Sequence, residues 1–211
     1  MASEVRICNL ALSRVGARRI SSLSENTKES RECNKIYTDT RDVVLAAHDW
    51  GFARKHKTLA AIATPTYPGW DYAYAYPTDC LAARRIKDDT GSVSQIAYDL
   101  EEERYRSVGK VEFEVRATEA LDGKVILTDQ ADAVLIYTAR VTDPNVFSIE
   151  FIDALAYRLA SDLAVPLRAD TRKSDTHFRK YTFLIGSAQA SSANEGYQKP
   201  DNGNSFVNAR G

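Results

Sequence analysis

The stretch SIEFIDALAYRLASDLAVP, Ser148 to Pro166, has the pattern of a buried helix. Large side chains recur every four residues along one ridge and mostly small ones along the next (Phe151, Leu155, Leu159, Leu163; Ile152, Ala156, Ala160, Ala164). Two adjacent apolar ridges make a wider face than a surface helix needs. Ser148 is suited to cap the helix, and Pro166 to end it, because a residue before proline avoids helical angles. The rest of the chain must therefore supply packing partners for this helix.

Three further segments have helical periodicity: residues 3–15, 27–47 and 170–193. Gly16 is placed just past the first of them, where a left-handed residue commonly ends a helix. Ser24 or Asn26 is expected to cap the second, whose apolar stripe includes Val43. Four helices of this kind predict an antiparallel bundle.

The middle third of the chain changes to the period of a β-strand. Residues 70–77, WDYAYAYP, alternate aromatic with small or acidic side chains, which is typical of a strand with one packed face. Residues 52–63 are also expected to form a strand. Val111, Phe113 and Val115 are expected to point inward, and Asp122-Gly123 is the strongest short hairpin signal in the chain.

These periods predict an α+β fold with three parts. Residues 1–51 and 142–194 form an antiparallel bundle of about four helices, residues 52–141 form an inserted β-rich subdomain, and residues 195–211 form an extended C-terminal arm. The 211 residues, 44% of them hydrophobic, are enough for one domain with a large insertion.

Composition excludes some classes of protein. The formal net charge of −1 argues against a strongly basic nucleic-acid binder, and no apolar run is long enough to span a membrane. Three scattered cysteines are too few for a disulfide framework, so we expect reduced thiols and assembly in a cytoplasm. Cys8 and Cys33 are expected to pack against each other across the first two helices, and not to act as nucleophiles.

No motif for catalysis, a metal or a cofactor is present. His48, His56 and His177 lack ligand spacing among themselves or with the cysteines, and the common hydrolase and nucleotide-binding signatures are missing. A glycosidase-type carboxylate pair is an open alternative, although a solvated acidic face explains the run Glu101–Glu103 more simply. We therefore expect no enzyme, no metal and no cofactor. The basic clusters at Arg14 and Arg54 are expected to meet protein and not DNA.

Residues 195–211 have a different composition from the rest. Gly, Asn, Asp and Pro dominate, and the large apolar residues are Tyr197, Phe206 and Val207. Such a segment cannot bury enough surface to offset its own ordering. It is either a short linear binding segment or a disordered one with incidental hydrophobic residues.

Several elements, in order, resemble the head-to-tail adaptors of short-tailed bacteriophages, the tail tubular protein A family. They are the opening ICNLALSRVGARRISSLSE, the run with Val44, Leu45, Trp50 and Phe52, the segment with Pro77, Asp79, Cys80 and Leu81, the helix FIDALAYRLASDLAVPL, and the final SFVNARG. The residues between Asp88 and Val141 match least.

The resemblance implies a non-enzymatic virion protein of the tail or neck. Twelve copies would form a ring under the portal protein, extend the channel for genomic DNA without reading its sequence, and carry the next tail protein, the nozzle. The arm would bind the portal through Tyr197, Phe206, Val207, Ala209 and Arg210. Because DNA must slide, we expect acidic or neutral residues to line the channel, with Glu101, Glu102 and Glu103 as candidates. No membrane partner is expected.

Two other functions stay open at this point. One is a muramidase-like protein that degrades peptidoglycan during entry, built on a carboxylate pair. The other is a head-completion connector of a long-tailed phage, which would have a similar fold and similar partners.

Overall fold

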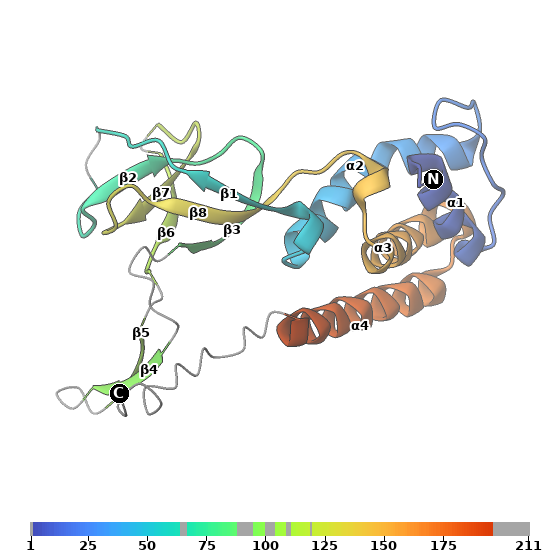
Figure 1. Ribbon diagram of the computed structural model, residues 1–211. Coiled ribbons are helices and arrows are strands. Elements are labelled where there is room, and N and C mark those ends of the chain that lie inside the picture. Colours follow the sequence, from blue (N-terminus) through green and yellow to red (C-terminus); the bar gives the residue numbers. More distant parts are fainter. Residues whose placement is uncertain are drawn as a thin grey trace.

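The computed structural model describes residues 2–63, 67–87, 95–99, 104–108, 111–118 and 120–195, without the side chains of 95–99, 104–108 and 191–195. Figure 1 shows two lobes, with helices at one end and strands at the other. The four helices, which we call the helical body, are α1 (Glu4–Val15), α2 (Lys28–Ala47), α3 (Ile149–Arg168) and α4 (Thr171–Glu195). Short 3₁₀ turns lie at Gly51–Ala53 and Pro144–Val146.

The strands all lie between α2 and α3 in the sequence, so the α+β fold with an inserted β subdomain is confirmed. They are β1 (Arg54–Thr58), β2 (Tyr72–Ala75), β3 (Cys80–Ile86), β4 (Gln95–Asp99), β5 (Arg104–Val108), β6 (Glu114–Ala117), β7 (Lys124–Thr128) and β8 (Val134–Ala139). We call β1–β3 and β6–β8 the β lobe. They form two antiparallel sheets, β1-β8-β3 and β2-β7-β6, while β4 and β5 pair with each other.

Helix α3 is the centre of the helical body, as the two-ridge pattern predicts. The residues of the large ridge, Phe151, Leu155, Leu159 and Leu163, are all fully buried. In the small ridge the three alanines are fully buried and Ile152 is partly buried. Helices α1, α2 and α4 each pack along α3, because a face this wide needs more than one partner.

The ends of the helices were only partly predicted. Ser148 caps α3 by accepting a hydrogen bond from the amide of Phe151, and Gly16 follows α1 with φ of 79°. The expected cap of α2 is wrong, because Thr27 accepts the hydrogen bond from the Ser30 amide.

Pro166 does not end α3, which continues to Arg168. The reversal comes at Ala169, which adopts φ of 51° and donates its amide to the carbonyl of Val165 at 2.8 Å. The amide of Asp170 donates to Ala164 at 3.4 Å, which closes the last turn. A proline so near the helix end removes one backbone hydrogen bond and disturbs few others. The packing of the buried face of α3 therefore outweighs the tendency of the residue before a proline to leave the helical conformation.

The expected stripe on α2 contains an error. Val43 is 53% exposed, whereas Arg41 is buried and forms an ion pair with Asp42 at 2.8 Å. The periodicity alone did not reveal this, because an arginine can be buried when a carboxylate accompanies it.

The core of the β lobe lies between its two sheets. Tyr74 of β2, Ile126 of β7, and Leu135 and Tyr137 of β8 pack together, and all four are buried. The Tyr74 hydroxyl donates to the carbonyl of Gln130 at 2.9 Å. The predicted packed aromatic face is therefore confirmed at Tyr74, whereas Tyr72, on the same face by alternation, is 41% exposed.

Three details of the β lobe differ from expectation. β1 begins at Arg54, because Phe52 turns away into the helical core. Val111 and Phe113 pack on the β core as predicted, but Val115 is 39% exposed. β6 and β7 pair as predicted from Asp122-Gly123, yet the connection is wider than a two-residue turn, since Ala117 pairs with Lys124 and Leu121 takes the positive φ of 57°.

Arg84 of β3 joins the β lobe to the helical body. Its guanidinium donates at 2.8 Å to the Thr138 hydroxyl and, also at 2.8 Å, to the carbonyls of Ala46 and His48. These carbonyls belong to the end of α2, where the last carbonyls of a helix lack partners and favour a cation. A second link is the ion pair of Arg140 with Asp42 at 2.7 Å, so the lobes are held together by charged hydrogen bonds as well as by the chain.

Candidate docking site

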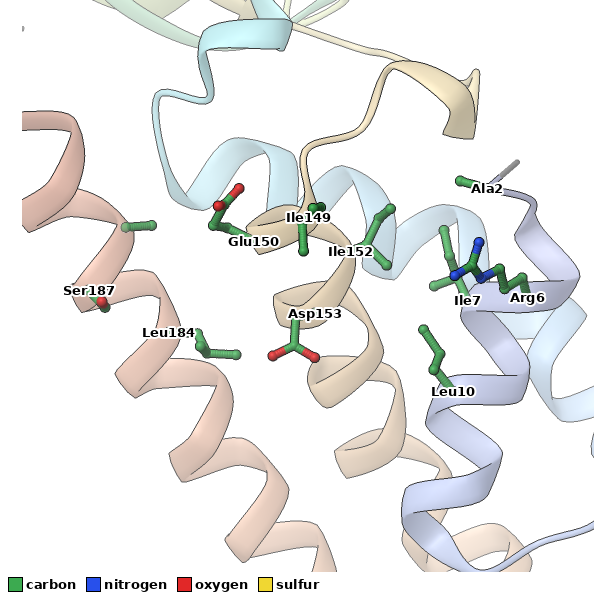
Figure 2. Close-up of a pocket in the computed structure, with 11 residues that line it drawn as sticks. Ala2, Arg6, Ile7, Leu10, Ile149, Glu150, Ile152, Asp153, Leu184 and Ser187 are labelled. Atoms are coloured by element: carbon green, nitrogen blue, oxygen red, sulfur yellow. The ribbon is translucent and has the colours of Figure 1, made fainter. Parts of the chain in front are cut away.

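An apolar groove opens on the helical body between α1, the first turn of α3 and the second half of α4 (Figure 2). Its volume is about 650 Å³. The lining residues are Ala2, Arg6, Ile7, Leu10, Ile149, Glu150, Ile152, Asp153, Leu184, Ser187 and Ala188. Most of them are apolar, and the size suits a few side chains of a peptide or a neighbouring protein.

The groove exists because α1 and α4 flank α3 and, among the described residues, are hydrogen-bonded to each other near one end. There, Lys173 of α4 donates to the carbonyl of Val15 at 3.2 Å, and Arg168 at the end of α3 donates to the carbonyl of Gly16 just past α1. At the other end Leu10 of α1 and Leu184 of α4 lie on opposite sides of α3 (Figure 2). The surface of α3 between them is therefore left uncovered.

Apolar side chains at the groove contact water. Leu10 is 38% exposed and Ile149 is 82% exposed, so both add to the apolar surface of the groove. Neither residue lies on the buried face of its helix. The sequence therefore offered one signal for this groove, namely a large apolar residue outside the buried stripe of its helix. By itself that is a weak signal for a binding site.

Charged groups stand around this apolar floor. Asp153 pairs with Arg14, whose guanidinium lies 3.6 Å from the centre of the Tyr157 ring. Glu150 is exposed and makes no ion pair within the described residues. Its carboxylate is therefore available to a cation on a docked segment.

The basic clusters singled out in the sequence meet carboxylates of the same chain. Arg14 pairs with Asp153, Arg54 pairs with Asp49 at 3.0 Å, and Lys55 pairs with Asp79 at 2.8 Å. These pairs lie within one chain, so contact of the clusters with another protein stays a prediction. The direction in which they face within any assembly stays a prediction.

Strand β1 is a second candidate contact surface. It lies at the edge of its sheet, and all five of its side chains, RKHKT, are exposed. Its free edge offers backbone groups to a further strand. Arg54 and Lys55 already pair with Asp49 and Asp79, so the positive charge of this edge is partly neutralised. The charged side chains still discourage indiscriminate pairing of the strand.

The two thiols expected to meet do so. Cys8 and Cys33 are fully buried, and the interaction with the Cys33 thiol, together with burial, raises the pKa of Cys8. A buried thiol with a raised pKa is a packing group and not a nucleophile.

No group of three or more potential metal ligands comes together in the part of the chain that the structure describes. His48 is buried edge-on against Trp50, with ring centres 4.8 Å apart, and burial lowers its pKa. His177 stacks loosely on Tyr157 at 6.0 Å. Across the same described residues, no helix is long and apolar enough to cross a membrane.

Among the described carboxyl groups, the one with a raised pKa is Asp162, where burial is the main cause and the ion pair with Arg158 at 3.2 Å opposes it. A glycosidase acid needs a raised pKa and a second carboxylate across a cleft. Asp162 is instead held by an arginine one turn away on the same helix, so it offers the muramidase alternative no specific support.

The predicted functional residues fall outside the described residues. These are the proposed portal-binding positions Tyr197, Phe206, Val207, Ala209 and Arg210, and the proposed channel-lining positions Glu101, Glu102 and Glu103. The predictions for them therefore stay predictions.

The residues that carry the family resemblance are mainly packing residues. Val44, Leu45 and Trp50 are buried in the helical core, and Trp50 donates its indole N–H to the carbonyl of Val44 at 2.9 Å. Asp79 accepts hydrogen bonds from Lys55 at 2.8 Å and from the Tyr137 hydroxyl at 2.9 Å. Compared with known proteins, the chain matches no family model, and no curated protein matches its sequence.

Proposed function

We propose that this protein is a structural subunit of a head-to-tail adaptor ring in a short-tailed bacteriophage. The ring docks under the portal, extends the DNA channel and provides the platform for the next tail protein. The sequence resemblance, which runs in order along the chain, supplies the identity of the partners. The observation that carries the proposal is that the protein has two separate surfaces suited to contact other proteins, one on each lobe.

These two surfaces differ in chemistry. The helical body offers the apolar groove between α1, α3 and α4, and the β lobe offers the basic free edge of β1. A connecting subunit must hold at least two different neighbours at once. Surfaces of different chemistry prevent each neighbour from binding at the other's site. The ion pairs and hydrogen bonds of Arg84 and Arg140 stiffen the joint between the lobes. This would let a ring subunit keep a fixed distance between its partners.

In this proposal the arm attaches each subunit to the portal. Phe206 and Val207 insert in a groove of the portal, and Arg210 pairs with an acidic group there. The seventeen or so residues of the arm span up to roughly 55 Å when extended. Repetition around a twelve-fold ring makes a weak single contact strong in sum.

The direct test is co-sedimentation with the cognate portal ring. The full chain is compared with Phe206→Ala and with the control Gln189→Ala, which changes an exposed residue of α4 that does not line the groove. We expect the full chain and the control to bind with about twelve copies per portal, and Phe206→Ala to bind weakly.

Three outcomes are informative. If Phe206→Ala binds as the full chain does, the assignment of the anchor is wrong, although the adaptor function survives. If no version binds, the adaptor function is wrong, and zymography on peptidoglycan becomes the next test. Clearing in that assay would establish the muramidase alternative, and its absence is expected.

A further inference from the structure

We propose that residues 204–210, NSFVNAR, fold back onto the apolar groove of their own chain while the protein is free. Phe206 and Val207 would enter the space between α1 and α4, and Arg210 would lie against Glu150. The contact itself is independent of any partner. Its regulatory role, described below, rests on the adaptor function proposed above.

The groove is suited to a short apolar segment. Its lining includes Ile152 of α3, Leu10 of α1 and Leu184 of α4, and Figure 2 shows Leu10 and Leu184 on either side of α3. Its volume of about 650 Å³ is ample for a phenylalanine and a valine side chain together with the backbone that joins them. Covering the exposed side chains of Leu10 and Ile149 would remove apolar surface from water.

The segment begins next to the groove. Helix α4 lines the groove with Ser187 and Ala188 and ends at Glu195, about two turns or roughly 10 Å further along its axis. Phe206 follows about eleven residues later, and a chain of that length spans up to roughly 36 Å. The segment can therefore reverse direction and reach the groove with slack, which Tyr197, only two residues past the helix, cannot do.

The chemistry of the segment also matches. Phe206-Val207 is the one pair of adjacent large apolar residues among residues 196–211, and the residues around it are small or amide side chains that solvate well. Arg210 is the cation nearest to this pair, and Glu150 is an exposed carboxylate at the rim of the groove. An arginine–carboxylate pair at the rim would fix the direction in which the segment lies.

Tethering makes a weak contact sufficient. A short flexible linker gives an effective concentration on the order of millimolar. A contact with a dissociation constant of about 1 mM is then roughly half occupied, and one of about 0.1 mM is roughly nine-tenths occupied. A partner that needs the same segment would then bind more weakly than it binds a free segment, by about twofold for a contact of about 1 mM and by about tenfold for one of about 0.1 mM. The groove would thus hold the arm until a portal with higher affinity withdraws it.

The test is methyl NMR on the full chain without any partner. Spectra of the native sequence are compared with those of the full-length double variant Phe206→Ser, Val207→Ser, and with the control Tyr197→Ser. We expect the methyl signals of Leu10, Ile149, Ile152 and Leu184 to shift in the double variant, because the ring of Phe206 leaves them. The methyl signals of the β core, such as Ile126 and Leu135, should not move, and the control should match the native spectrum.

Dilution distinguishes the occupants. Shifts that persist unchanged over a hundredfold dilution support the intramolecular contact. Shifts that disappear on dilution show that the segment of one copy binds the groove of another, which overturns the proposal. Groove signals that are identical in the native chain and the double variant overturn it as well. In that case portal co-sedimentation with Phe206→Ala still tests the adaptor function separately, so the two proposals can fail independently.

Discussion

Arg84 provides a sensitive test of how the two lobes are joined, because one side chain bonds to both. In Arg84→Ala the Thr138 hydroxyl, which is fully buried, and the carbonyls of Ala46 and His48 lose their donor. A hydrogen bond from a charged group contributes about 1.5–3 kcal/mol, and bonds that share one donor are not additive. We therefore expect the free energy of unfolding to fall by about 3 kcal/mol.

That loss should be easy to measure. For a chain of this size 1 kcal/mol corresponds to about 2–4 °C in melting temperature, so Arg84→Ala should melt about 6–12 °C below the native protein. The matched control is Arg85→Ala, which removes the same type of side chain from the neighbouring, exposed position on β3. We expect this control to lie within about 0.5 kcal/mol of the native protein.

The assay is thermal and urea unfolding followed by circular dichroism. If both the Arg84 and the Arg85 variants melt close to the native protein, the reasoning is refuted, because water then replaces the Arg84 guanidinium without cost. A large loss in both variants would refute it too, since it would place the effect in the strand and not in the joint.

Three further predictions concern stability. Asn9→Ala should cost about 1–2 kcal/mol in urea unfolding, because the Asn9 amide exchanges two 2.8 Å hydrogen bonds with the backbone of Ile20. Asn9→Asp should also destabilise the protein, because its carboxylate keeps the acceptor but replaces the donor that faces the Ile20 carbonyl, and a neutral result for both variants would contradict this explanation. Ser148→Ala should cost about 1 kcal/mol through loss of the α3 cap, and Ser148→Asp should restore it; a neutral Ser148→Ala would mean that packing alone fixes the start of α3. The hydrogen bond from Lys55 lowers the pKa of Asp79 below its ordinary value, so the stabilisation from this pair is present above the ordinary pKa and is lost as the pH falls through the lowered one. Asp79→Asn should therefore flatten the decline in melting temperature at acidic pH, and an unchanged slope would argue against the pair.

The sequence predicted most of the helical body, since helical periodicity reports directly on burial. The face of α3 and the caps at Gly16 and Ser148 follow from local chemistry. The helix end predicted from Pro166 is wrong, because the left-handed residue Ala169 and the packing of α3 decide where the helix ends. Val43 was wrongly placed in the buried stripe of α2, and the burial of Arg41 was not predicted, because periodicity does not show that Asp42 pairs with this arginine.

The groove was not predictable from local patterns. It depends on α1 and α4 being tied at Lys173 and apart near Leu10 and Leu184, which is a property of three helices together. The hydrophobic periodicity of one helix carries no information about the distance between two other helices. The sequence did single out Phe206 and Val207 as an apolar pair in a polar segment, and this pair is the occupant now proposed for the groove.

The central position of α3 has a consequence for synthesis of the chain. Helices α1 and α2 bury their apolar faces mainly against α3, yet α3 begins about 100 residues after α2 ends. At roughly 5–20 residues per second, a ribosome needs about 5–20 s to make the intervening strands. During that interval the first two helices have apolar faces without their main partner, so the nascent chain should be a client for chaperones that bind early. Its yield should depend more on translation speed through residues 52–141 than on the stability of the finished fold.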